Sequence, residues 1–140
     1  MRYVELAELY NRLADTSKRL EKTDIIADFL KNTKKEDLEN VVCLLNGRVF
    51  PLWDSRKIGF SSRLLIKAIS SATGSSVDNI EKELNKLGDL GDVAELEISR
   101  KSQKTLFSET LTIKKVADNI RRLSDMEGSG SVDRKIGLVA

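Results

Sequence analysis

The chain has 140 residues, of which 40% are hydrophobic and 33% are charged, and its formal net charge is +2. This length suits one domain with a real core, and so small a net charge means that any basic binding site must come from local clustering. With no histidine and one cysteine, an internal disulfide, the usual zinc sites and histidine-activated nucleophiles are excluded. No apolar run approaches the roughly 20 residues of a membrane span. We therefore expect a cytoplasmic domain without a catalytic residue, a metal site or a membrane partner.

Apolar residues recur at a helical period of about 3.6 residues along most of the chain, and no alternation typical of strands interrupts them. The expected helices begin near Tyr3, Thr23, Lys35, Ser61 or Ser62, Ser75, Asp92, Thr110 or Thr112, and Val132. The fold class is therefore predicted to be all-α, with about eight short helices joined by short loops. The last predicted helix is cut within the apolar run that ends at Ala140, which favours a fragment of a longer protein.

The segment Asn46–Thr73 departs from this pattern, because it contains the only proline and the only tryptophan of the chain. We expect its apolar residues to form a structural plug on the helical core: Val49, Phe50, Pro51 and Trp53. The following stretch, Arg56–Arg63, combines cations, a glycine and hydroxyls at a helix start, a composition typical of phosphate binding. A solvated cap on a core helix explains that composition equally well.

Two glycine-hinged loops also precede predicted helices. Gly88-Asp89-Leu90-Gly91 and Gly128-Ser129-Gly130-Ser131 each place free backbone N–H groups and the positive end of a helix dipole where an anion could bind. Arg134 and Lys135 follow the second loop and suit a nucleic-acid phosphate. The alternative is that these glycines only end helices.

A run of basic residues lies toward the C-terminal half. Between Arg100 and Arg122 there are seven basic residues against two acidic ones, although the whole chain is nearly neutral. Such asymmetry is typical of a domain with one basic binding face. Lysine-rich, solvated helices would show the same composition.

Residues 99–110, between the helices expected near Asp92 and near Thr110 or Thr112, form an expected exposed connector. It contains Gln103, Leu106 and Phe107 in the order used by peptides that bind sliding clamps. In such a peptide the aliphatic and aromatic side chains enter a hydrophobic pocket, and the glutamine forms hydrogen bonds beside it. The alternative is that Leu106 and Phe107 pack on the core of this domain.

Seven blocks, in order, resemble the N-terminal DNA-binding domain of archaeal ATP-dependent DNA ligases: MRYVELAELYNRL, RLEKTDIIADFL, GRVFPLWD, LLIKAISSATG, GDLGDVAE, QKTLFSETLTIKKV and EGSGSVDRKIGLVA. The resemblance covers all of residues 1–140 and implies a monomeric all-helical domain that grips the minor groove of nicked double-stranded DNA. It also implies that adenylation and OB domains outside these residues supply nick sealing with ATP and Mg²⁺. No cofactor is expected within residues 1–140.

The resemblance also implies which residues face DNA: Lys57, Gly59, Ser61, Arg63, Gly88, Asp89, Leu90, Gly91, Gly128, Ser129, Gly130, Ser131, Arg134 and Lys135. It places a motif for the sliding clamp, PCNA, within residues 103–107. Phe60 and Ser61 stand where the family commonly has Val-Gly, and Val132 stands where it often has Gln. Two other functions remain open at this point: a helical protein-interaction module that does not bind DNA, and a helix-turn-helix regulator, which the lack of a clear recognition helix disfavours.

Overall fold

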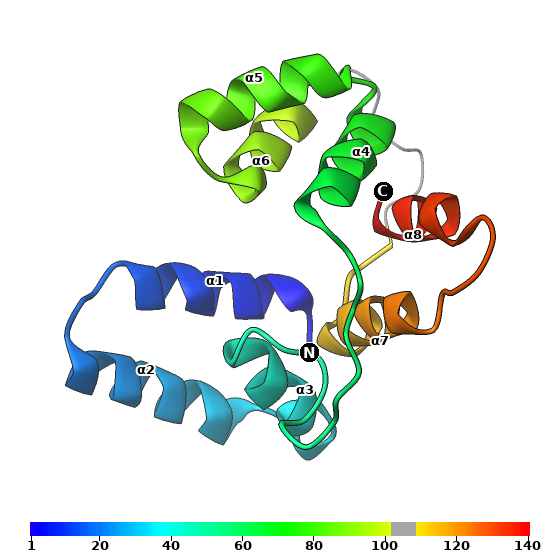
Figure 1. The fold of residues 1–140 in the computed structure, drawn as a ribbon. Helices are drawn as coiled ribbons and strands as arrows, with labels where there is room; N and C mark the ends of the chain where they lie inside the picture. Colours follow the sequence, from blue (N-terminus) through cyan, green and yellow to red (C-terminus); the bar gives the residue numbers. More distant parts are fainter. Residues whose placement is uncertain (102–108) are drawn as a thin grey trace. The chain divides into compact units, whose positions relative to one another are not determined.

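The computed structural model of the chain describes residues 1–101 and 109–140, which form eight helices (Figure 1). They are α1 (Tyr3–Ala14), α2 (Arg19–Asn32), α3 (Lys35–Leu45), α4 (Ser62–Thr73), α5 (Val77–Leu87), α6 (Leu90–Arg100), α7 (Ile113–Ser124) and α8 (Ser131–Val139). In this described part the only β-type pairing is an isolated bridge between Arg2 and Thr112. The predicted all-α class is confirmed.

The chain divides into two compact units. Unit 1 comprises Met1–Arg56 and Glu109–Arg121, and unit 2 comprises Lys57–Ser108 and Arg122–Ala140. Each unit is therefore built from two separate stretches of sequence. None of the helices in the described ranges combines the length and the apolar character that crossing a membrane requires.

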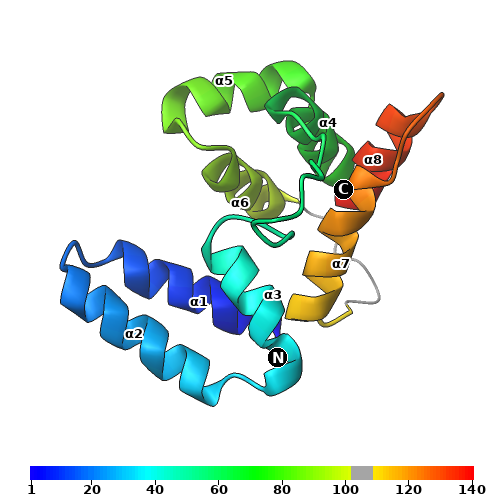
Figure 2. The same ribbon diagram turned by 60° about the horizontal axis from the view of Figure 1, so that its bottom comes forward.

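The core of unit 1 lies where α1, α3 and the start of α7 meet. It consists of the buried residues Leu6, Leu9, Val41 and Ile113. Leu6 and Leu9 are three residues apart and therefore share one face of α1. Helix α2 lies beside α1 in both ribbon views (Figures 1 and 2) and contributes partly buried apolar side chains instead of fully buried ones.

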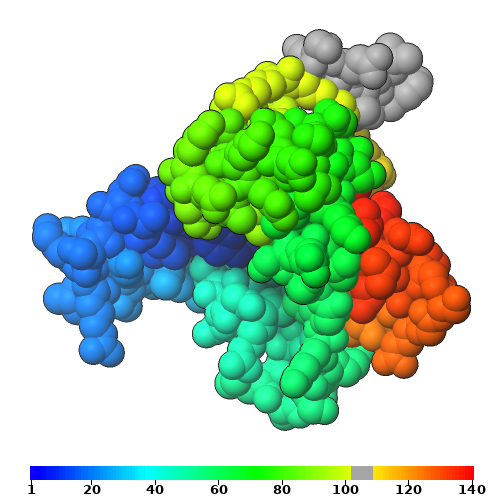
Figure 3. All heavy atoms as spheres, turned by 45° about the horizontal axis from the view of Figure 1, so that its top comes forward, coloured from blue at the N-terminus to red at the C-terminus, as the bar shows by residue number. Residues whose placement is uncertain are grey.

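The core of unit 2 lies between α4, α5 and α6. Its buried members are Ile66 and Ile69 on α4, Ile80 on α5 and Val93 on α6. Helices α5 and α6 pack against each other, and their atoms form a continuous part of the face shown in Figure 3. Helix α8 packs against α4 as well, so α4 is the central helix of this unit.

Local capping chemistry sets the starts of α4 and α5. The hydroxyl groups of Ser61 and Ser76 accept hydrogen bonds of 3.3 Å from the amides of Leu64 and Asn79, respectively, and thereby begin α4 and α5. The largest difference from the prediction is at α2, which begins at Arg19 instead of near Thr23, and α6 begins at Leu90 instead of near Asp92. Helix α6 starts early because Asp89 is its N-cap residue.

The predicted plug is partly wrong. Val49 and Phe50 are buried, with 3% and 6% of their surface exposed, whereas Trp53 is 84% exposed. The reason is a turn closed by a hydrogen bond of 3.1 Å from the Asp54 amide to the Pro51 carbonyl oxygen. Trp53 occupies one of the two middle positions of this turn, which lie at the protein surface.

Candidate nucleic-acid interface

The loop that leads into α4 alternates between exposed and partly buried residues. Lys57, Gly59 and Ser61 are exposed, and Ile58 and Phe60 between them are half-buried. A chain with this alternation fixes itself to the protein through its apolar side chains and presents the intervening residues to solvent. The residues predicted to contact phosphate in this loop, including the exposed Arg63 on the first turn of α4, are therefore accessible.

Arg56, which the sequence places in the same phosphate-binding stretch, contacts residues of the preceding loop in unit 1. Its guanidinium lies 2.7 Å from Asp54 and 4.2 Å from the centre of the Phe50 ring. Hydrogen bonds from Arg56 lower the pKa of the Asp54 carboxyl group. Arg56 therefore stabilises the loop of unit 1, and the exposed cations of unit 2 begin at Lys57.

Two of the predicted segments meet in unit 2. The Nζ of Lys135, on α8, donates a hydrogen bond of 3.0 Å to the carbonyl oxygen of Gly59. Gly59 has a φ of +61°, and a Cβ built on it would lie 3.1 Å from that Nζ. Glycine suits this position because it adopts the left-handed conformation readily and leaves space for the lysine.

The start of α8 has no side-chain cap. Its N-cap residue is Gly130, with a φ of 71°, and no side chain accepts a hydrogen bond from the first-turn amides at that position. Arg134 is exposed, and one of its guanidinium nitrogens donates to the Glu127 carbonyl oxygen at 3.1 Å. Asp133 is the acidic residue of the first turn. The Ser131 amide donates to the Gly128 carbonyl oxygen at 3.2 Å, so an anion at this helix start can bind the next amides, with cations close by.

The start of α6 is different because its own sequence supplies the anion. The Asp89 carboxylate accepts hydrogen bonds of 2.7 Å from the Gly91 amide and 3.3 Å from the Asp92 amide. In both ribbon views the turn between α5 and α6 lies at the end of unit 2 away from α8 (Figures 1 and 2). The DNA contact predicted for Gly88–Gly91 stays a prediction, and a phosphate there would compete with this carboxylate.

All the residues predicted to face DNA belong to unit 2. They lie in three places in the sequence, and the structure joins the Lys57–Arg63 loop to α8 through Lys135. The clamp motif, with Gln103, Leu106 and Phe107, lies outside the described residues. Its exposure stays a prediction.

The described basic residues of the run from Arg100 to Arg122 are divided between the two units. Its cations bond to groups of the protein in both units: Arg100 to Glu97 and Glu83, Lys101 to the Ala72 carbonyl oxygen, Lys114 to Asp118, Lys115 to Glu109, and Arg121 to Asn40 and the Val49 carbonyl oxygen. Much of the positive charge in the described part of this run is therefore balanced within the fold.

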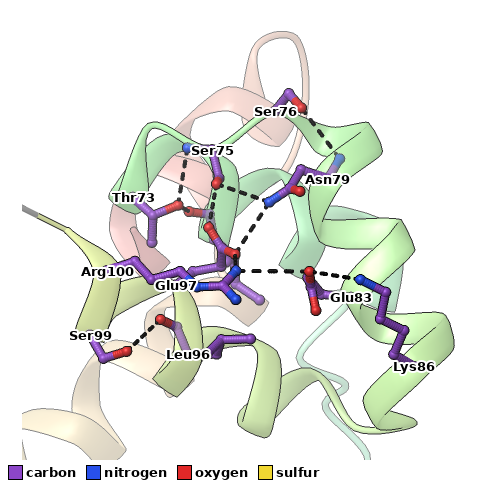
Figure 4. A network of polar contacts seen from close by, with 11 residues as sticks. Thr73, Ser75, Ser76, Asn79, Glu83, Lys86, Leu96, Glu97, Ser99 and Arg100 are labelled. Carbon is purple, nitrogen blue, oxygen red and sulfur yellow. Dashed lines mark hydrogen bonds and ion pairs between the residues drawn. The ribbon is translucent and has the colours of Figure 1, made fainter.

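A buried carboxylate on α6 is a further feature of unit 2 that the sequence analysis missed. Glu97 is 4% exposed and accepts hydrogen bonds from the Ser75 hydroxyl group, from Asn79 at 3.2 Å and from Arg100 at 3.1 Å (Figure 4). These partners come from the loop before α5, from α5 and from α6. Glu97 lies four residues after the buried Val93 on the same helix face, and that spacing was the available signal.

The family model described as "DNA ligase N terminus" matches residues 2–140. The chain belongs to this DNA ligase family. A DNA ligase of Thermococcus fumicolans is 46% identical over 140 residues, and one of Methanothermobacter thermautotrophicus is 44% identical over 137 residues. A protein named DNA ligase 2 from Korarchaeum cryptofilum is 31% identical over 140 residues.

These alignments cover 98% to 100% of this chain but only 24% or 25% of each ligase. The chain thus spans about a quarter of the length of the curated relatives it matches, and it corresponds to the N-terminal region named by the family. The resemblance inferred from the seven sequence blocks is confirmed.

Proposed function

We propose that the chain is the DNA-gripping N-terminal part of an ATP-dependent ligase that seals nicks in duplex DNA during replication, repair and recombination. The observation that carries this proposal is the match to the DNA ligase N-terminal family over residues 2–140. It is supported by the location of every predicted DNA-facing residue in one compact unit. The monomer grips the DNA backbone along the minor groove.

The grip rests on phosphate contacts and therefore does not depend on base sequence. The exposed amides and cations of the Lys57–Arg63 loop and of the α8 start contact phosphate oxygens. Since cations that neutralise phosphates release counterions, the affinity falls steeply as salt rises. Lys57, Arg63, Arg134 and Lys135 together give a slope of about −3.6 in log K against log salt, or roughly a hundredfold loss between about 50 and 200 mM.

The chemical steps take place in other domains. An adenylation domain and an OB domain of the longer protein would hold ATP and Mg²⁺, which would supply AMP for transfer to the 5′ phosphate. Attack by the 3′ hydroxyl on that phosphate would then release AMP and seal the nick. Among residues 1–101 and 109–140, no three acidic, histidine or cysteine side chains form a group that could hold a metal ion. No step of the reaction is assigned to a cofactor bound by this chain.

The deciding experiment measures binding of this chain to a nicked duplex across a series of salt concentrations. We expect the salt slope given above and similar affinities for nicks in unrelated sequences. Arg134→Glu should weaken binding roughly 30-fold at low salt, because it places a carboxylate where a guanidinium faces phosphate. Lys82→Glu makes the same change in charge at an exposed position on α5 and should cost less than about threefold. Binding that is independent of salt, or equal losses for both variants, would contradict this function.

The sliding clamp, PCNA, is proposed as a second partner of the longer ligase through residues 103–107. Phe107→Ala should weaken binding to the clamp at least tenfold, because the aromatic side chain is the main apolar anchor of such a peptide. Lys104→Ala, within the same segment, is the control and should change the affinity little. Calorimetric titration of the clamp gives both values, and circular dichroism checks that the helices are unchanged. Equal affinities for the wild type and Phe107→Ala would remove the clamp from the proposal.

A helical protein-interaction module is the second candidate function, and one observation in unit 1 favours it. Leu52 and Trp53 are 82% and 84% exposed, and exposed apolar residues of this size are typical of binding surfaces. A neighbouring hollow of about 320 Å³ is lined by Arg48, Phe50 and Leu52, among others. A chain that fails to bind nicked DNA at any salt concentration would favour this second function.

A further inference from the structure

Lys135 connects two segments of unit 2 that are 76 positions apart in the sequence. Its hydrogen bond to the Gly59 carbonyl oxygen is 3.0 Å long. Lys135 is half-buried, whereas its neighbour Arg134 is exposed. Because α4 and α8 pack against each other, this contact joins the loop before α4 to a helix that is already fixed on the same unit.

The half-buried side chains of Ile58 and Phe60 also fix the loop to the protein. The C-terminal end of the loop is held by the Ser61 hydroxyl group, which accepts from the Leu64 amide at 3.3 Å. Its middle contains Gly59, which can adopt conformations of either φ sign and therefore loses much conformational entropy when it is held in one of them. The Lys135 hydrogen bond acts at this residue.

We propose that Lys135 is a positioning residue that holds the Lys57–Arg63 loop in the conformation in which it contacts phosphate. This inference rests on the proposed function and goes beyond the phosphate contact that the sequence assigns to Lys135. An ammonium group has three N–H donors, so the bond to Gly59 leaves two for a phosphate oxygen. The same cation also offsets the negative end of the Gly59 carbonyl dipole, which would otherwise repel a phosphate.

A loop that is ordered before DNA arrives binds more tightly, because less entropy is lost on association. Removal of the Lys135 hydrogen bond should therefore have two effects. It should loosen the loop in the free protein, and it should weaken DNA binding by more than the loss of one surface charge. If Lys135 only contacted phosphate, its removal would leave the free loop ordered. DNA binding would then weaken only as much as the loss of one surface charge predicts.

The first measurement is made without DNA. Backbone ¹⁵N relaxation of the chain should give order parameters near 0.85 for the amides of residues 59–61, falling below about 0.6 in Lys135→Met. Lys135→Arg keeps a cationic donor that can reach the carbonyl oxygen and should keep the loop ordered. Lys82→Met, on the exposed face of α5, is the control for loss of a lysine from the same unit.

The second measurement is binding to nicked duplex at one low salt concentration. Lys135→Met should bind at least roughly tenfold more weakly, Lys135→Arg within about threefold of wild type, and Lys82→Met within about twofold. Unchanged order parameters in Lys135→Met, or a loss of affinity equal to that of Lys82→Met, would overturn the positioning role alone. A wild-type chain that binds no nicked DNA would instead overturn the proposed function, while the relaxation data would still decide whether Lys135 orders the loop.

Discussion

The two glycine-hinged helix starts of unit 2, at α6 and at α8, have similar compositions but differ in what their backbone amides bind. At α6 the amides of Gly91 and Asp92 donate to the Asp89 carboxylate. At α8 the N-cap residue is Gly130, and no side chain caps it. Where a carboxylate already accepts hydrogen bonds from the first-turn amides, few amides remain to bind a phosphate, and the carboxylate repels it. The α8 start and the Lys57–Arg63 loop joined to it therefore form the stronger phosphate-binding candidate.

The two helices also differ in how they are held in unit 2. Helix α6 has a buried carboxylate near its C-terminal end, Glu97, with partners on the preceding loop and on α5 (Figure 4). Helix α8 packs on α4 and bonds to the loop before α4 through Lys135. We infer that acidic residues hold α6 within the fold, whereas no side chain caps the start of α8.

The largest expected effect tests this view of α6. Glu97→Ala should lower the free energy of unfolding by about 3 kcal/mol, because it removes a buried acceptor and leaves partly buried partners such as Asn79 without their hydrogen bond. Glu95→Ala removes an exposed carboxylate from the same helix and should change stability by less than about 0.5 kcal/mol. Urea denaturation followed by circular dichroism measures both. Similar midpoints for the two variants would mean that the Glu97 network does not hold α6.

The difference between the two helix starts also shows what the sequence could predict. Serines and glycines at helix ends act on amides within a few residues, so the caps at Ser61 and Ser76 were predictable. The Asp89 cap is equally local, and the preference of aspartate for N-cap positions could have identified it. The family resemblance came from seven blocks in order, which together are far more specific than any one of them.

Other features were predicted wrongly or not at all. Trp53 was expected in the core because it is large and apolar, but a turn places it at the surface. Arg121 was counted as part of a basic face, yet it bonds to Asn40, 81 positions away in the sequence. The bond between Lys135 and Gly59 likewise has no local signal. The bonds of Arg121 and Lys135 join distant parts of the chain, which short sequence patterns do not encode, whereas the turn at Trp53 is local.

A pair of glycine substitutions tests the comparison directly. Gly88 and Gly130 both have left-handed φ values, of 82° and 71°, and a Cβ would meet no other atom at either position. Alanine should therefore cost each site about 1 kcal/mol of stability through backbone strain alone. DNA affinity should fall roughly fivefold for Gly130→Ala, because strain displaces amides that bind phosphate. It should stay nearly unchanged for Gly88→Ala.

Thermal unfolding and titration with nicked duplex, carried out below both melting temperatures, give the two quantities for each variant. We expect Gly88→Ala and Gly130→Ala to lose similar amounts of stability, and only Gly130→Ala to lose affinity for DNA. Equal losses of affinity would mean that the Asp89 carboxylate does not set the two helix starts apart.

The smallest expected effect is a gain in DNA affinity instead of a loss, and it tests whether the Gly88–Gly91 loop faces DNA. Asp89→Asn keeps an N-cap oxygen, since asparagine caps about as well as aspartate, and should change stability by less than about 0.5 kcal/mol. It removes the negative charge that competes with phosphate at the Gly91 amide. If the loop faces DNA as predicted, affinity for nicked duplex at low salt should rise about threefold.

The control for this substitution is Asp78→Asn, which makes the same change in charge in the first turn of α5, at an exposed residue not predicted to face DNA. Its gain should be smaller, because only the overall field changes there. If both variants gained the same affinity for DNA, the cause would be the change in net charge. Loop Gly88–Gly91 would then serve only to end α5 and begin α6, and the proposed grip on DNA would rest on the Lys57–Arg63 loop and the start of α8.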